Sequence, residues 1–187
     1  MTASEVADLV GELKEGYAAS SLWLFFLGQP DLPALLNSRG LDPGSTSSLG
    51  RKDNTYYRGI DVYASIAHAV GNANYNLRFL RNQFSMMLSL VADQLAENQY
   101  FDQPGTPRPR ELELFRHLRN AASHGNRFNF RNDEPRRPAG FKAFVIDDTL
   151  KGNANPLYGT VAMFDFINPG DLFDLFDWVE GHLRSLP

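Results

Sequence analysis

The 187-residue chain contains no cysteine, which excludes disulfide bonds, thiolate metal sites and cysteine nucleophiles. Long apolar runs are also missing, because the longest, 22–27, is far shorter than the roughly 20 residues that a membrane-spanning helix needs. The N-terminus lacks a basic segment followed by an apolar core, so no signal peptide is expected. No histidines and carboxylates stand at metal-ligand spacing, so no cofactor is expected. These absences favour a cytoplasmic protein that does not contact a membrane.

The charge of the chain is unevenly distributed. The net charge is −4, which argues against a general nucleic-acid coat. Residues 108–137 nevertheless hold eight arginines against four acidic residues, a net charge of +4 in that window. Such a patch is typical of a protein that binds a phosphate backbone, although a solvated arginine-rich loop would give the same count.

Apolar spacing predicts a mainly helical protein. A hydrophobic content of 43% and the chain length predict one globular domain, 1–187. Its expected parts are an N-terminal helical segment (1–37), a Gly- and Ser-rich loop (38–59) and a core (60–187). Thr2 and Glu5 form a capping box for a helix to residue 27, and 31–37 favours a short helix. Apolar residues at steps of three and four predict a second long helix over 61–97.

The C-terminal part predicts a small hairpin and a last helix. Two short strands are expected at 141–147 and 159–166, with the turn at 148–158. The last helix is expected to run from Pro169 or Asp171 to Leu186, with five residues facing inward: Leu172, Leu175, Phe176, Val179 and Leu183. The predicted fold class is therefore mainly α, a bundle of four to five helices with a β-hairpin before the last helix.

The segment 111–130 concentrates the polar chemistry. Thr106 is expected to cap its helix with Pro107 at the first position, and Gly125 to end it. The last turns then carry Arg119, Asn120 and His124.

These three side chains suit phosphodiester chemistry. Histidine has an unperturbed pKa near neutrality and can transfer protons. Arg119 can bind a phosphate bidentately, and Asn120 can orient either group. Arg119 and His124 are five residues apart, about 140° around a regular helix, so they serve one site only if the helix end distorts or a second copy supplies the partner. The alternative is a histidine that only interacts with the helix C-terminus, with a surface arginine before it.

The string from Arg119 to His124, R-N-x-x-x-H at the end of a helix and followed by glycine, resembles the signature of the HEPN superfamily (higher eukaryotes and prokaryotes nucleotide-binding domain). The resemblance extends over roughly residues 60–185, as HEPN domains are helical bundles. It implies a homodimer with a shared cleft and a metal-independent RNA endonuclease. His124 would be the acid or base, Arg119 would stabilise charge and Asn120 would fix the geometry. The expected products are a 2′,3′-cyclic phosphate and a 5′-hydroxyl.

The resemblance also suggests a biological setting. Many HEPN proteins are toxins of toxin–antitoxin systems or antiviral defence effectors, so an antitoxin or defence partner is a further expectation. In the branch that is inactivated by nucleotidylation, a tyrosine lies two residues after the histidine. Here that residue is Asn126, which argues against such control.

Five further arginines are candidates for RNA binding: Arg116, Arg127, Arg131, Arg136 and Arg137. Two other classes of function remain open. One is a non-catalytic HEPN-like module that binds RNA, a nucleotide or a protein through the same patch. The other is a helical dimerisation subunit, which the apolar run 22–27 would suit, because this run is apolar all round and is expected to be buried or covered by a partner.

Overall fold

The computed structural model of the chain is mainly helical, which confirms the predicted fold class. It describes residues 1–27, 29–40, 46–47, 51–52, 60–61, 64, 68 and 72–186. The helices in this part are α1 (Ala3–Leu27), α2 (Leu32–Ser38), α4 (Ala73–Glu97), α5 (Arg110–Ser123) and α6 (Pro169–Arg184), with a 3-10 turn at Gly152–Ala154. Two small antiparallel sheets pair β1 (Thr46–Ser47) with β2 (Ile60–Asp61) and β3 (Ala139–Phe141) with β4 (Phe144–Ile146).

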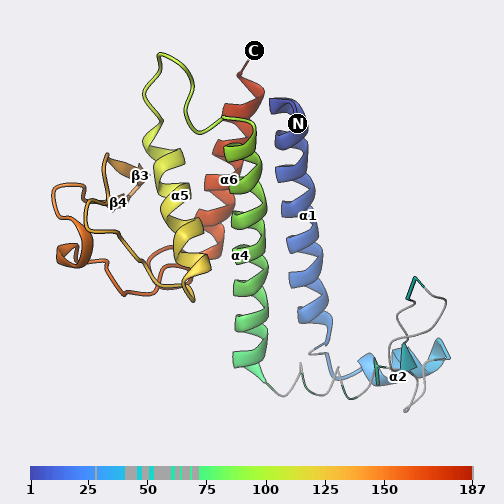
Figure 1. Cartoon of the computed structure of the whole chain (residues 1–187). Coiled ribbons are helices and arrows are strands. Elements are labelled where there is room, and N and C mark those ends of the chain that lie inside the picture. The colour runs from blue at the N-terminus through green and yellow to red at the C-terminus, as the bar shows by residue number, and fades with distance from the viewer. Residues whose placement is uncertain are drawn as a thin grey trace. The chain divides into compact units, whose positions relative to one another are not determined.

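The chain divides into two compact units. The first comprises Met1–Tyr17 and Arg81–Pro187, and the second comprises Ala18–Leu80. Within the first unit, α5 packs against α6 and against β3, and Figure 1 shows the β3–β4 hairpin beside α5. The candidate functional residues all lie in this first unit.

Aromatic side chains fill the core of the first unit. Phe84, Phe115 and Phe176 are fully buried. Phe115 meets Phe176 edge to face at a centroid distance of 5.4 Å, and Tyr17 lies 4.2 Å from Phe84. Such pairs are worth about 0.5–1.5 kcal/mol beyond the burial of their area. The five residues of α6 that were expected to face inward are all buried, so this prediction is confirmed.

The sequence predicted a specific N-terminal cap for two helices, and one of these caps is correct. At α1, the Glu5 amide donates to Oγ1 of Thr2 at 3.2 Å and the Thr2 amide donates to Oε2 of Glu5 at 2.7 Å, which is the expected capping box. Helix α5, in contrast, begins at Arg110 after Pro109, not at 107 after Thr106. A residue before proline is biased away from helical backbone angles, so Pro109 keeps Arg108 out of the helix.

The hairpin exists, but its strands are not the predicted ones. Residues 141–147 were expected to form one strand, yet the chain turns within this segment and β3 pairs with β4, with Phe141 opposite Phe144. Lys142 has a φ of 50°, the left-handed conformation that such a tight turn needs. Residues 159–166 do not form the second strand. They contribute only single bridges, such as Val161 to Arg127.

The second long helix is shorter than predicted. Helix α4 begins at Ala73. Asp61, which was expected to be helical, lies in β2 and pairs with Thr46 of β1. Most of 62–71 lies outside the described residues, as does most of the predicted loop 38–59. The division of the chain into 1–37, 38–59 and 60–187 stays a prediction.

The apolar run 22–27 is only partly buried. Leu27 is buried with Leu32, and Leu24 and Leu36 pack against them. Four residues of the run are exposed within the chain: Leu22, Trp23, Phe25 and Phe26. One chain therefore does not bury the run fully, and its coverage by a partner stays a prediction. Among the described helices, none combines the length and apolar content that crossing a membrane requires.

Candidate functional site

Helix α5 presents one apolar face to the core and one polar edge to the solvent. Leu114, Phe115 and Leu118 are buried on the apolar face. Arg119 and Asn120 are half-buried in the last turns. His124 is the C-cap, and Gly125 follows with a φ of 68°, so the predicted end of the helix is confirmed.

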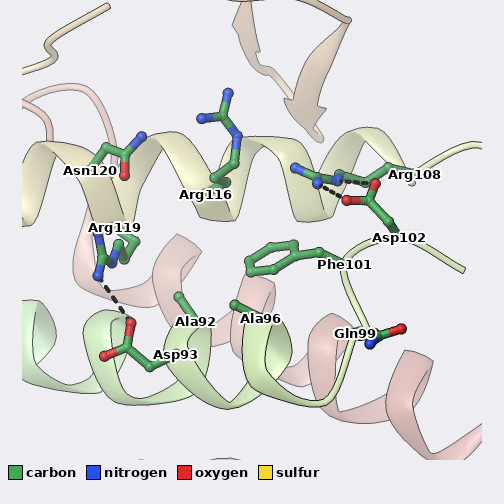
Figure 2. Close-up of a pocket in the computed structure, with 10 residues that line it drawn as sticks. All are labelled: Ala92, Asp93, Ala96, Gln99, Phe101, Asp102, Arg108, Arg116, Arg119 and Asn120. Atoms are coloured by element: carbon green, nitrogen blue, oxygen red, sulfur yellow. Dashed lines mark hydrogen bonds and ion pairs between the residues drawn. The ribbon is translucent and has the colours of Figure 1, made fainter.

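A pocket of about 590 Å³ lies along this polar edge. It is lined by α4, by the connection to α5 and by α5 itself (Figure 2), through Ala92, Asp93, Ala96, Gln99, Phe101, Asp102, Arg108, Arg116, Arg119 and Asn120. Helix α4 contributes two small apolar side chains, Ala92 and Ala96, and the carboxylate of Asp93, whereas two arginines and Asn120 line the α5 side. Three arginines and two aspartates in the lining give a nearly balanced charge rather than a purely basic surface.

Arg119 reaches across the pocket to α4. Its Nη2 donates a hydrogen bond to Oδ1 of Asp93 at 3.0 Å, and both side chains keep access to solvent (Figure 2). This is the one hydrogen bond of the Arg119 side chain to the described residues. Its remaining N–H donors are therefore available to a ligand.

Arg116 points away from α4 (Figure 2). Its Nη2 lies 2.6 Å from Oε1 of Glu113, and its Nη1 lies 2.9 Å from Oε1 of Glu134. Burial alone would lower the pKa of Arg116, but the hydrogen bonds that it donates to these carboxylates raise its pKa above the usual value. Arg116 therefore has both ends of its guanidinium engaged inside the protein. Its predicted role in RNA binding stays a prediction.

Glu113 is the centre of a buried ionic cluster. Its side chain is 2% exposed and accepts hydrogen bonds from Arg108 at 2.8 Å and from Arg116. His117, also buried, places Nε2 3.4 Å from Oε1 of Glu113. Burial would raise the pKa of Glu113, but hydrogen bonds from His117 and Arg116 outweigh it, and the pKa lies well below the ordinary 4.5. The cluster holds the carboxylate ionised and fixes the arginines around it.

His124 lies beyond the pocket. It is exposed and does not belong to the pocket lining. Its backbone N–H donates to the carbonyls of Asn120 and Ala121, and its imidazole has no hydrogen-bond partner among the described residues. One copy of the chain thus brings Arg119 and Asn120 to the pocket but leaves His124 outside it.

Asn126, two residues after the histidine, has a structural role. It is buried, with a φ of 64°, and its side-chain amide exchanges two hydrogen bonds with the backbone of Met163, at 2.9 Å and 2.8 Å. These two bonds hold Asn126 in the interior of the first unit, and the absence of control by nucleotidylation stays a prediction.

The outer arginines differ in how firmly they are held. Arg136 forms an exposed pair with Asp133, and Arg137 lies 3.6 Å from Asp102. Arg127 donates to the carbonyl of Gly159 at 2.7 Å. The side chain of Arg131 is exposed and makes no ion pair with the described residues. The predicted role of these four arginines in RNA binding stays a prediction.

Sequence reasoning missed the carboxylates that meet these arginines. Asp93 lies 26 residues before Arg119, so nothing local predicts the pair. Asp102, whose pKa is lowered by its hydrogen bond from Arg108, lies just before the window that was counted as basic. Glu113 had a usable signal, since it stands three and four residues before Arg116 and His117, the spacing of ion pairs on a helix.

Comparisons of the chain with protein-family models, curated proteins and solved structures found no match.

Proposed function

We propose that the protein is a metal-independent RNA endonuclease of the HEPN type. Arg119, Asn120 and His124 would act on one phosphodiester. The observation that carries the proposal is the last turn of α5, where Arg119 and Asn120 line a pocket and the exposed His124 follows at the helix end. The imidazole is accessible and has no partner among the described residues, as a group that must exchange protons with a substrate requires.

Two copies of the chain would form the complete site. Within one copy, Arg119 turns to Asp93 on α4 while His124 lies outside the pocket lining. A two-fold dimer that joins the ends of two α5 helices would place His124 of one copy beside Arg119 of the other. We expect its interface to bury at least about 1,200 Å². A role as a toxin or defence effector, with its own protein partner, follows from the HEPN resemblance alone.

The reaction would be an in-line attack of the RNA 2′-hydroxyl on the adjacent phosphorus. His124 would take up or supply the proton, and Arg119 would bind the phosphate oxygens as negative charge develops. The bond to the 5′-oxygen of the next nucleotide breaks. The products are a 2′,3′-cyclic phosphate and a 5′-hydroxyl.

The test of the proposal is the fate of an end-labelled single-stranded RNA mixed with pure protein in EDTA. Cleavage that leaves cyclic-phosphate ends supports it. RNA that is retained but never cut would instead identify a binding module, and RNA that is neither retained nor cut would favour a structural subunit.

The arginines after α5 should make RNA binding depend on salt. Each phosphate that Arg136 or Arg137 neutralises releases a counterion, so changing both residues to alanine should flatten the slope of log K against log salt by roughly 0.7 per lost contact. Their present partners, Asp133 and Asp102, are exposed, so these ion pairs are weak and can exchange for phosphate. Filter binding at several salt concentrations measures the slope. An unchanged slope would show that neither side chain touches a phosphate.

A further inference from the structure

The pair between Arg119 and Asp93 differs from the other arginine pairs of the pocket. Arg116 binds the carboxylates of two buried residues, Glu113 and Glu134, and Arg108 binds Glu113 as well as Asp102. Arg119 has one hydrogen bond to the described residues, to a carboxylate whose side chain is 54% exposed. Of the three arginines in the lining, Arg119 is the one whose partner a ligand could displace without opening the core.

Asp93 occupies the position that an anion would take. Arg119 extends from α5 toward α4, and the carboxylate of Asp93 meets its guanidinium at the pocket (Figure 2). A phosphate that binds Arg119 must therefore replace this carboxylate or bind beside it. In either case two negative groups come close together, which weakens the binding of the phosphate.

We propose that Asp93 is an internal competitor for Arg119, which holds the guanidinium when no RNA is bound and lowers the affinity of the site for RNA. The inference rests on the proposed function, because it takes the phosphate at Arg119 to belong to the substrate. Asp93 is not a catalytic residue in this scheme. It lowers the affinity of the site for RNA and holds the side chain of Arg119 in place until the substrate binds.

An ordinary surface salt bridge would give the same geometry but not the same response to a mutation. Removing the carboxylate of a purely structural pair leaves RNA affinity unchanged or lowers it, because Arg119 loses its orientation. Removing a competitor raises the affinity. The sign of the change therefore separates the two roles.

The experiment measures the binding of a fluorescent single-stranded RNA to the full-length chain in EDTA. All variants carry His124→Ala, so that the RNA stays intact. Adding Asp93→Asn is expected to tighten binding roughly threefold to tenfold, because the amide keeps the shape but not the charge. The salt slope should steepen by roughly 0.7, because the displaced carboxylate no longer takes up a cation on binding. Asp93→Glu, which keeps the carboxylate, should remain near the parent affinity.

The matched control is Asp8→Asn. Asp8 pairs with Arg184 at 2.9 Å, its side chain is 60% exposed, and neither residue lines the pocket. This variant changes the net charge by the same amount as Asp93→Asn, and it should leave the RNA affinity and the salt slope almost unchanged. Equal effects of the two substitutions would show that the affinity depends only on the net charge of the chain, and this would overturn the inference. Weaker RNA binding by the Asp93→Asn variant would also overturn it.

The steady-state kinetics of the chain with His124 intact give a second readout. A competitor raises KM, so Asp93→Asn should lower KM and leave kcat unchanged. A lower kcat at constant KM would make Asp93 a positioning residue for Arg119 and would overturn the inference. If Asp93→Asn tightens binding but the wild-type chain never cuts RNA, the proposed catalysis fails and the role of Asp93 in binding stands. If no variant binds RNA, both fail.

Discussion

Replacing His124 with alanine is expected to lower the rate of RNA cleavage in EDTA roughly 10²–10⁴-fold, the usual contribution of a positioned acid–base group. The fold should survive the change. His124 is exposed, its imidazole makes no hydrogen bond to the described residues, and the helix-ending bonds come from its backbone N–H. The free energy of unfolding, measured by thermal denaturation, should therefore differ from that of the wild type by no more than about 0.5 kcal/mol, as is usual for a surface substitution. Loss of activity without loss of stability would assign the chemistry to the imidazole.

A second histidine provides the control for this variant. His182 lies on α6 and stacks on Trp178 at a centroid distance of 5.1 Å, and it does not line the pocket. His182→Ala should keep the cleavage activity. If His124→Ala cuts RNA as fast as the wild type, the nuclease is a contaminant or the site lies elsewhere.

A mixture of two inactive variants is expected to regain activity if the site is shared between two copies of the chain. An Arg119→Ala chain and a His124→Ala chain, allowed to exchange subunits, form heterodimers in which one of the two composite sites is intact. Since about half of the dimers are mixed, about a quarter of the wild-type activity should return. An active particle that is strictly monomeric at micromolar concentration would contradict the shared site.

Replacing Glu113 with alanine is expected to destabilise the fold by about 3–5 kcal/mol, the usual cost of breaking a buried ion pair by removing one partner. Glu113 is buried and bonds to Arg108 and Arg116, with His117 beside it. Its removal leaves the positive charges of the cluster less compensated in a region with little water. Urea unfolding followed by circular dichroism measures the change. The activity of the fraction that remains folded should change much less, because Glu113 does not line the pocket.

A neighbouring glutamate separates the effect of burial from the effect of charge. Glu111 lies two residues earlier on α5 and pairs with the exposed Arg110 at 3.2 Å. Such a surface pair is worth about 0–1 kcal/mol, so Glu111→Ala should be close to neutral. A loss of similar size at both positions would mean that helix propensity, not the buried cluster, determines the result.

The same cluster predicts the direction of the acid response. The pKa of Glu113 is lowered in the folded state, so its contribution to stability is fully present above the ordinary carboxyl pKa of 4.5 and is lost as the pH falls toward the folded-state value. Asp102 and Glu134, whose pKa values are also lowered, act in the same direction. When the pH is lowered from 5 to 3, a range that includes the ordinary carboxyl pKa of 4.5, the free energy of unfolding of Glu113→Gln should therefore fall less than that of the wild type.

The sequence by itself determined the helical class and most helix positions. The inward residues of α6 follow from a spacing of three and four, which is a local property of a helix. The capping box at Thr2 and the helix end at Gly125 are equally local, because each depends on a few neighbouring residues. The assignment of Arg119, Asn120 and His124 to a site also came from the sequence, and their catalytic roles stay predictions.

Only the tertiary structure decided which charges meet and where the strands lie. The basic window after residue 108 is compensated in part by Asp93 and Asp102, which reach it because α4 and its connection pack beside α5. An ion pair between distant segments depends on how helices pack, and no local pattern encodes that. The hairpin lies at a different position from the predicted one, because a turn at Lys142 interrupts an apolar segment that was predicted to be one strand. Apolar spacing fixes which face of an element is buried, but the partner on that face is chosen by the packing of the whole chain.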